Sequence, residues 1–322
     1  MIDISDISAR QRAVQEQVRQ TDASRPREEM SSAMQARARR YPEPPFPDQE
    51  LDKPGLEMKQ QVAPLYDAPF YRGSGKLDGM KAIITGGDSG IGGAVAVLFA
   101  REGADIAIIH LPDEQADADV TCGAVEREGR RCLSIAGDVT SRSFCNDAVG
   151  RAVDELGGLN VLVNNAAFQL HVSRFEDLSD EHFDLTIKTN LYGYFHMVQA
   201  CLPYLKPGSS IINTGSVTGF EGSSSIVDYS MTKGGIHAFT RALSGSLLPK
   251  GIRVNAVAPG PVWTPLNPSD DGEKAKQFGG KIAMKRPAQP EELSPAYVFL
   301  ASPQMSSYIT GEILPVVGGY AQ

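Results

Sequence analysis

The 322-residue sequence is poor in cysteine, with four, and in tryptophan, with one, and it has no excess of basic residues. Lysine and arginine number 31 against 39 aspartates and glutamates, which gives a net charge of −8. This balance argues against general binding to nucleic acid or to anionic membranes. No segment reaches the roughly 18 apolar residues of a membrane span. We therefore expect neither a nucleic acid nor a membrane as a partner.

The cysteines and histidines show none of the spacings of a metal site. There is no C-x-x-C pair and no H-E-x-x-H cluster, so we predict no metal and no disulfide framework. Four buried free thiols in a reducing compartment are expected, at Cys122, Cys132, Cys145 and Cys201. The N-terminus is acidic where a signal peptide is basic, and we expect a cytoplasmic protein.

Composition changes near residue 76. Residues 1–76 hold eight of the 21 prolines, and the run from Pro42 to Pro47 favours an extended polyproline conformation. Residues 1–40 have sparse apolar positions, enough for one or two weak surface helices, and such a leader cannot bury a core of its own. We therefore expect an N-terminal extension over 1–76, a Pro-rich arm, and a catalytic domain over 77–322.

Beyond residue 76, short β-branched runs alternate with longer helical stretches, which is typical of βαβ units. Seven strands are expected, at residues 82–85, 105–109, 133–136, 160–163, 210–214, 252–256 and 312–316. Helices are expected between them, near residues 91–102, 114–129, 142–157, 180–205, 228–249 and 291–301. The pattern predicts an α/β fold with a doubly wound parallel seven-stranded sheet of the Rossmann type.

A glycine-rich turn follows the first expected strand. Gly86 permits a tight turn, Gly90 lets a pyrophosphate approach the backbone, and Gly92 lets the following helix pack closely. The N-terminus of that helix offers free N–H groups to phosphates. The turn predicts a dinucleotide site that also includes Asp88, Ser89 and Ile91.

The residues after the second and third strands leave NAD and NADP both open. His110 stands where NAD-binding folds often carry an acidic residue, and no lysine or arginine is placed there for a 2′-phosphate. Asp113 and Glu114 follow closely and favour NAD slightly. Asp138 can accept a hydrogen bond from the adenine amino group, or it can be the N-cap of the next helix.

Tyr229 and Lys233 lie four residues apart in an expected helix, so they share one face. A neighbouring ammonium stabilises a phenolate and lowers its pKa, which makes the pair competent to donate and recover a proton. Ser216 follows the strand at 210–214 and places a hydroxyl at the carboxyl edge of the sheet, where α/β proteins bind ligands.

These motifs, together with Asn164-Asn165-Ala166-Ala167, Asn190 and Pro259-Gly260, resemble the short-chain dehydrogenase/reductase family over residues 77–322. The arm and the motifs are similar to an N-terminally extended bacterial subgroup described as glucose/ribitol dehydrogenase-like or aldehyde reductase-like. Ala167 replaces the glycine that ends the family motif. The resemblance implies a homotetramer.

By the same resemblance, Tyr229 is the general acid/base, Lys233 holds the nicotinamide ribose, Ser216 polarises the substrate carbonyl, and Asn190 anchors a water. The implied cofactor contacts are Gly86, Asp88, Ser89, Gly90, Ile91, Gly92, His110, Asp138, Val139, Asn165, Ala166, Tyr229, Lys233, Pro259, Gly260 and Val262.

We therefore predict an oxidoreductase that transfers a hydride between NAD or NADP and a small alcohol/carbonyl substrate such as an aldehyde, ketone, sugar or polyol. Two alternatives remain: a 3-oxoacyl thioester reductase and a non-catalytic dinucleotide-binding protein. A substrate lid is expected over 262–287, with Trp263, Phe278 and Met284 as its apolar contacts. The arm is expected to clasp the body or a neighbouring subunit.

Overall fold

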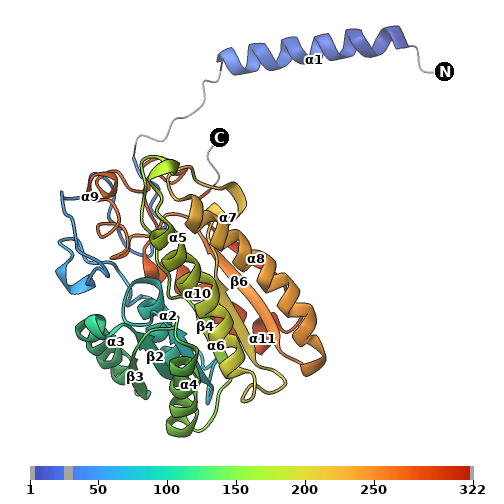
Figure 1. Ribbon diagram of the computed structural model, residues 1–322. Helices are drawn as coiled ribbons and strands as arrows, with labels where there is room; N and C mark the ends of the chain where they lie inside the picture. Colours follow the sequence, from blue (N-terminus) through green and yellow to red (C-terminus); the bar gives the residue numbers. More distant parts are fainter. Residues whose placement is uncertain (1–3, 25–31, 320–322) are drawn as a thin grey trace. The chain divides into compact units, whose positions relative to one another are not determined.

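The computed structural model describes residues 4–24 and 32–319 and divides the chain into two units, Met1–Met34 and Gln35–Gln322 (Figure 1). The first unit holds helix α1, Ile4–Ser24. Its apolar side chains Ile7, Val14 and Val18 are exposed. The second unit holds the arm from residue 35 together with the whole α/β body.

The body is built on one parallel sheet of seven strands in the order β3-β2-β1-β4-β5-β6-β7. The strands are β1 Lys81–Thr85, β2 Asp105–His110, β3 Cys132–Ala136, β4 Val161–Asn164, β5 Ser210–Thr214, β6 Arg253–Pro259 and β7 Ile313–Val316. Strand order reverses between β1 and β4, and doubly wound folds bind ligands at the carboxyl ends of the strands at such a point. The predicted fold class is confirmed.

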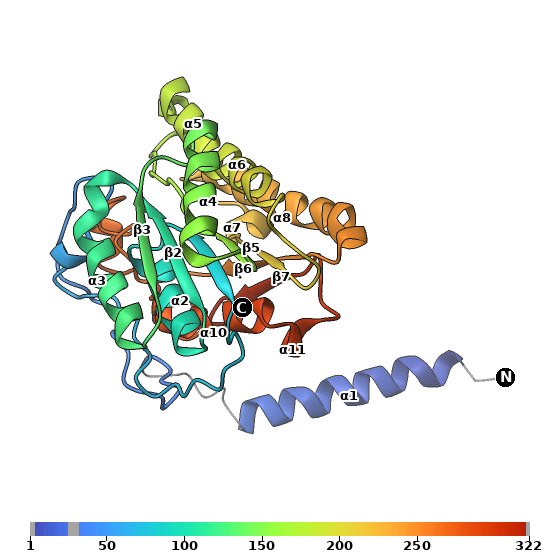
Figure 2. The ribbon, with the colours of Figure 1, turned by 90° about the horizontal axis from the view of Figure 1, so that it is seen from below.

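Helices cover both faces of the sheet (Figure 2). One face carries α2 Gly90–Arg101, α3 Gln115–Arg127, α10 Pro290–Ala301 and α11 Pro303–Ser306. The other carries α4 Arg142–Leu156, α5 Asp180–Ile187, α6 Gly193–Cys201 and α8 Val227–Leu247. Two short helices lie in loops, α7 Thr218–Glu221 and α9 Gly272–Ala275. Each face has its own apolar core because the strands are buried on both sides.

The expected helix over 180–205 is interrupted. Between α5 and α6 the backbone forms a π-helical turn, Lys188–Tyr192, which contains the buried Asn190. Such turns often occur at functional sites. Periodicity in the sequence does not reveal a single π turn, because the apolar spacing on either side stays helical.

The cysteines are only partly as expected. Cys145 and Cys201 are buried free thiols. Cys122 on α3 and Cys132 at the start of β3 form a disulfide with a Cα–Cα distance of 5.2 Å, so the prediction of four free thiols is wrong for this pair. The chain reverses direction between α3 and β3 and thereby brings together two residues whose ten-residue separation matches no sequence motif.

The arm lies against the body through aromatic and charged contacts. The Phe46 ring stacks on Trp263 with centroids 4.0 Å apart, and the Trp263 indole donates to the Val62 carbonyl at 2.8 Å. Arg39 pairs with the buried Glu291 of α10. Trp263 and Phe278 therefore hold the arm, which corrects their expected role as apolar substrate contacts of a lid.

The arm also includes the 3₁₀ turn η1, Glu57–Lys59. Four further short turns lie in the body: η2 Pro112–Glu114, η3 Phe175–Asp177, the π turn η4 Lys188–Tyr192 and η5 Leu248–Lys250. Over the part of the chain that the structure describes, none of the helices has the length and apolar character that crossing a membrane requires.

Replacing Phe46 with alanine tests how firmly the arm is attached. Phe46 is 5% exposed, and removing its ring leaves a cavity against Trp263, so we expect Phe46→Ala to lower the free energy of unfolding by about 3 kcal/mol. Denaturant unfolding and limited proteolysis of residues 35–76 would measure this. The control is Phe70→Ala, at a ring that is 43% exposed. Equal effects of the two changes would contradict the anchoring role of Phe46.

Candidate active site

The glycine turn connects β1 to α2 and has the backbone shape that the sequence predicts. Gly86 has φ +60° and Gly90 has φ +50°, values at which a side chain is strained. A Cβ at Gly92 would collide with the carbonyl oxygen of Gly86, and one at Gly90 would lie 3.2 Å from Thr264. The bare backbone therefore forms a shallow cradle at the N-terminus of α2, where a pyrophosphate fits.

Asn165 holds this turn against the sheet. Its side-chain amide donates to the Gly86 carbonyl at 3.0 Å, and its amide oxygen accepts from the Thr214 hydroxyl at 3.2 Å. The backbone amides of Asn165 and Ala166 donate to the Thr85 hydroxyl at 2.9 and 3.1 Å. The ends of β1, β4 and β5 are thus joined at one point, directly beneath the cradle. Asn164 instead pairs with Asn213 in the core.

A cleft of about 490 Å³ runs along the carboxyl edge of the sheet. Twelve of the predicted site residues line it: Gly86, Asp88, Ser89, Gly90, Ile91, His110, Asp138, Val139, Asn165, Ala166, Tyr229 and Lys233. Six others are not among the lining residues: Gly92, Asn190, Ser216, Pro259, Gly260 and Val262. Gly260 donates its amide to the Val316 carbonyl of β7 at 2.9 Å.

Tyr229 and Lys233 meet at one end of the cleft. The Lys233 ammonium lies 5.2 Å from the centre of the Tyr229 ring and donates to the Thr214 carbonyl at 2.8 Å. Burial lowers the pKa of Lys233 to about 7. Burial raises the pKa of Tyr229, and a hydrogen bond with Ser216 acts in the opposite direction. A proton donor, a nearby cation and a second hydroxyl are therefore assembled at the edge of the sheet.

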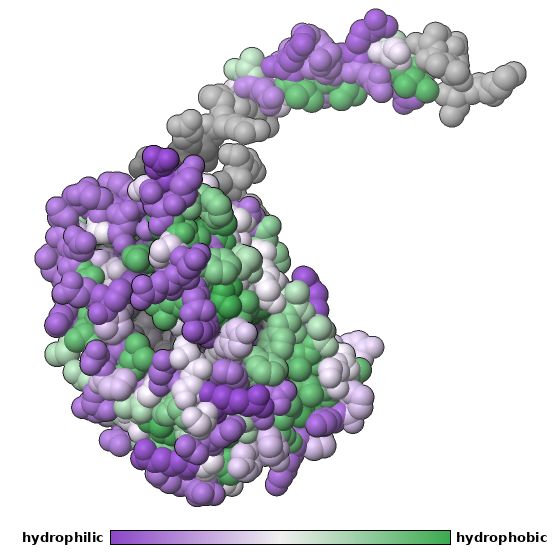
Figure 3. All heavy atoms as spheres, in the orientation of Figure 1, coloured by the Kyte–Doolittle hydropathy of each residue, from purple (hydrophilic) through white to green (hydrophobic). Residues whose placement is uncertain are grey.

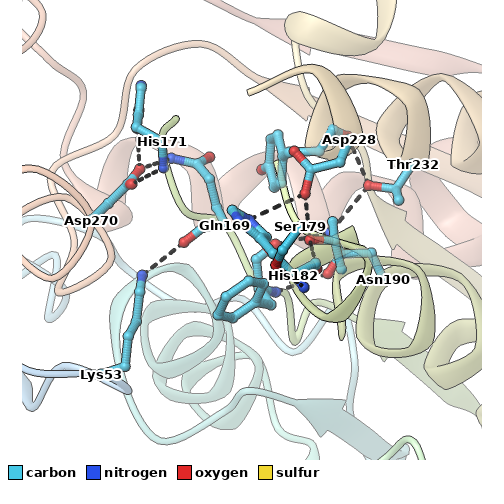
Figure 4. Close-up of polar contacts among 12 residues, drawn as sticks. Lys53, Gln169, His171, Ser179, His182, Asn190, Asp228, Thr232 and Asp270 are labelled. Carbon is cyan, nitrogen blue, oxygen red and sulfur yellow. Dashed lines mark hydrogen bonds and ion pairs between the residues drawn. The ribbon is translucent and has the colours of Figure 1, made fainter. Parts of the chain in front are cut away.

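Asn190 links the loop after β4 to α8 (Figure 4). Its amide oxygen accepts from the Phe168 amide at 2.8 Å, and its amide nitrogen donates to the Phe168 carbonyl at 2.9 Å and to the Thr232 hydroxyl at 3.1 Å. Thr232 directly precedes Lys233. The contacts of Asn190 thus fix the backbone around the tyrosine–lysine pair.

The other end of the cleft is acidic. Burial raises the pKa of Asp88, and burial together with the charge of Asp88 raises the pKa of Glu114 to about 8. Glu57, from the arm, accepts the Gly90 amide at 2.8 Å, and burial raises its pKa to about 8. Lys53 and Lys233 are the only lysines in the lining, which contains no arginine among the described residues.

His110 and Asp138 line the acidic end, but each already has partners. The Nδ1 of His110 donates to the Leu111 carbonyl at 2.8 Å, and its Nε2 lies 2.8 Å from the Ser134 hydroxyl. The Asp138 carboxylate accepts from the amide and hydroxyl of Thr140 at 2.8 and 2.7 Å. The N-cap of α4 is Ser141, so Asp138 does not have the alternative capping role.

The lining residues that the sequence interpretation did not name include two stretches, Lys53–Gly55 of the arm and Thr264–Leu266 after β6, together with Phe168, Leu185 and Thr189. Gly55 packs against Ser269 and Pro265, which brings both stretches to the same side of the cleft. The Pro54-Gly55 dipeptide signals a turn in the sequence, but not where that turn docks. Among the described residues, no group of three histidine, cysteine or acidic side chains is placed to hold a metal.

Comparisons with known proteins agree with this geometry. The family model described as enoyl-(acyl carrier protein) reductase matches residues 86–321. The chain is 51% identical over 274 residues to an uncharacterized oxidoreductase, YhdF, of Bacillus subtilis (strain 168), covering 85% of this chain and 94% of the relative. It is 43% identical over 281 residues to the glucose and ribitol dehydrogenase of Daucus carota, with 85% and 96% coverage.

A solved short-chain dehydrogenase of Burkholderia cenocepacia J2315, in complex with NADP, superposes with a TM-score of 0.71 at 31% identity. The match covers 76% of this chain and 98% of that one. Together, the doubly wound sheet, the glycine turn and the tyrosine–lysine pair define a nicotinamide-dependent oxidoreductase. The chain belongs to the short-chain dehydrogenase/reductase family, as its motifs predict. It is an NAD(P)-dependent enzyme acting on an alcohol/carbonyl pair.

Proposed function

We propose that the protein reduces and oxidises a small carbonyl/alcohol pair at the end of the cleft where Tyr229 and Lys233 meet, with Tyr229 as the proton donor. A nicotinamide bound in the cleft supplies or accepts the hydride. The observation that supports the assignment is the Lys233 ammonium 5.2 Å from the Tyr229 ring, because a cation at this distance favours the phenolate that remains after the proton leaves.

The neighbouring residues have supporting roles in this proposal. Ser216 shares a hydrogen bond with Tyr229 and directs the carbonyl oxygen of the substrate towards it. Lys233 binds the nicotinamide ribose with donors that remain beside its bond to Thr214. Asn190 acts as a positioning residue through Phe168 and Thr232 and anchors a water beside them. A non-catalytic binding protein would not need this arrangement.

At the N-terminus of α2, Ser89, Gly90 and Ile91 would hold the pyrophosphate, with Gly86 shaping the turn, and Asp138 and Val139 would line the adenine site. Gly92, Pro259, Gly260 and Val262, which are not among the lining residues, would act by keeping the backbone close to the cleft.

Of the two cofactors, we favour NAD(H). Asp88 and Glu114 line the end of the cleft opposite the tyrosine, with Glu57 and Asp117 next to them. A 2′-phosphate placed there would meet carboxylates instead of the arginine or lysine that NADP-binding folds use. A ribose hydroxyl, in contrast, can donate to Asp88 or Glu114.

The assembly that we propose is a homotetramer. Leu185, Tyr192, Phe195 and Met231 of α5, the π turn, α6 and α8 are 41–54% exposed. Figure 3 shows hydrophobic residues gathered on the face that carries α6 and α8. Apolar surface of this kind marks an interface, and a twofold axis would bury it against the same surface of a second copy.

We propose the cytoplasm as the compartment of the protein.

Removing the Tyr229 hydroxyl tests the catalytic assignment. Tyr229→Phe should lower kcat by at least about 100-fold, because general acid catalysis is lost, while NADH affinity is retained. Nicotinamide absorbance would measure turnover on a panel of aldehydes, ketones, sugars and polyols, and NADH fluorescence would measure binding. Tyr192→Phe, at a half-exposed ring, is the matched control. Turnover by Tyr229→Phe near that of the control would overturn the assignment.

The cofactor preference should depend on pH. Glu114 has a pKa of about 8, so it ionises between pH 7 and 9, whereas a 2′-phosphate is already dianionic above its pKa of about 6. The ratio of the Kd for NADPH to the Kd for NADH should therefore rise over this range, by about tenfold. Fluorescence titrations at pH 7 and 9 would measure it.

Glu114→Gln should weaken this pH dependence and leave only the part that Glu57 contributes, whereas Glu126→Gln, at an exposed carboxylate on the adjoining helix α3, should preserve it. Tighter binding of NADPH than of NADH at every pH would disprove the NAD(H) preference.

The proposed interface can be tested by adding charge to it. Phe195→Lys combined with Met231→Lys should reduce the mass measured by light scattering from four chains to two or one, because each lysine would be buried unpaired in the contact. Phe175→Lys, at a phenylalanine that is 64% exposed on η3, is the control. A mass equal to that of the control would exclude this face as the interface.

A further inference from the structure

Lys53 brings a positive charge from the arm into the cleft (Figure 4). Its ammonium donates to the Gln169 carbonyl at 2.8 Å and lies 3.4 Å from the Ser269 hydroxyl. It also lies 5.6 Å from the centre of the Phe168 ring. Lys53 thus bridges three segments that are distant in sequence: the arm, the loop after β4 and the segment after β6.

Asp270 acts electrostatically on Lys53 but forms no direct ion pair with it. Asp270 accepts hydrogen bonds from the backbone amide of His171 at 2.6 Å, from its ring Nδ1 at 2.5 Å, and from the Gln169 side chain. Burial would raise the pKa of Asp270, but these donors lower it overall and occupy both oxygens. Among the described residues, Lys53 forms no ion pair within 4.0 Å.

Burial makes an ammonium in this position costly, and the charge of Asp270 offsets only part of that cost. An ammonium has three donors, and Gln169 and Ser269 account for two of them. Burial lowers the pKa of Lys53, which reflects the cost of holding the charge away from water. A carboxylate or phosphate bound in the cleft would offset that cost with a charge-assisted hydrogen bond.

The location of Lys53 indicates which bound molecule carries the anionic group. The Lys53 ammonium lies 5.6 Å from the Phe168 ring, and Asn190 joins the Phe168 backbone to Thr232, which precedes Lys233, so Lys53 lies towards the tyrosine end of the cleft. The glycine cradle has its own backbone donors at the N-terminus of α2. The acidic end lies beyond it. An anionic group at Lys53 therefore belongs to the molecule whose carbonyl faces Tyr229.

We propose that Lys53 is a specificity-determining residue that binds a carboxylate or phosphate group of the substrate. The inference rests on the proposed function, since it concerns the substrate of the same site. His171, Gln169 and Asp270 are positioning residues in it. They hold the loop that presents the Gln169 carbonyl, and this carbonyl aims the ammonium into the cleft.

Binding of matched aldehydes tests this without turnover. The probes are two pairs that differ in an anionic group: D-glucuronate with D-glucose, and succinate semialdehyde with butanal. Each is titrated into Tyr229→Phe saturated with NADH, and the fluorescence of bound NADH is followed. The anionic member of at least one pair should bind about tenfold more tightly. Adding Lys53→Met should reduce this ratio to about one, and Lys53→Arg should keep most of it.

Lys59→Met, at an exposed lysine six residues along the arm, is the matched control and should leave the ratio unchanged. An equal ratio with and without Lys53, or no anion preference in either pair, would overturn the proposal. If Lys53→Met instead weakens NADH binding and leaves the substrate ratio unchanged, Lys53 binds the cofactor pyrophosphate. That result would also overturn the proposal.

Turnover measured on protein that retains Tyr229 shows whether the assignment of Lys53 or the proposed function has failed. Lys53→Met should raise KM for the anionic substrate about tenfold more than it raises KM for the neutral one. If no carbonyl compound is turned over but the Lys53-dependent binding ratio persists, the proposed function fails and the assignment of Lys53 stands. If turnover is normal and the ratio does not depend on Lys53, only the assignment fails.

Discussion

The hydrogen bonds of Asn165 and Thr85 at the carboxyl edge of the sheet are the constraint on which the cleft depends. Through them the glycine turn, the end of β4 and the end of β5 are held together. Thr214 belongs to the same cluster, and its carbonyl accepts from Lys233. The phosphate cradle and the proton-donating end of the cleft are therefore positioned by one set of buried polar contacts, which a small shift in any of the three strands would disturb.

The arm is part of this site and not an accessory to it. The stacking of Phe46 on Trp263 anchors one stretch, and Gly55 packs against Ser269. Between and beyond these anchors, Lys53 enters the cleft and Glu57 binds the first amide of α2. An extended segment without a core of its own can reach both ends of the cleft because each anchor is supplied by the body.

Charge is distributed unevenly along the cleft, and this follows from the arm and from the turn after β2. Asp88 and Glu114 make one end acidic, whereas Lys53 and Lys233 place two ammonium groups at the other. Burial shifts the pKa values of these groups towards their neutral forms. Binding of a ligand would reverse part of that shift, so the chemistry and the selectivity of the site are both expected to depend on pH.

By itself, the sequence determined the alternation of strands and helices, the glycine turn and the tyrosine–lysine pair, because these depend on local periodicity and short spacings. Their strand and helix positions agree with the structure to within a few residues. Only the tertiary structure decided the Cys122–Cys132 bond, the π turn at Asn190, the packing of Trp263 on the arm and the entry of Lys53 into the cleft. The disulfide joins cysteines ten residues apart across a reversal of the chain, the contacts of Trp263 and Lys53 join distant segments, and the π turn is a single irregularity. None of these leaves a periodic signal in the sequence.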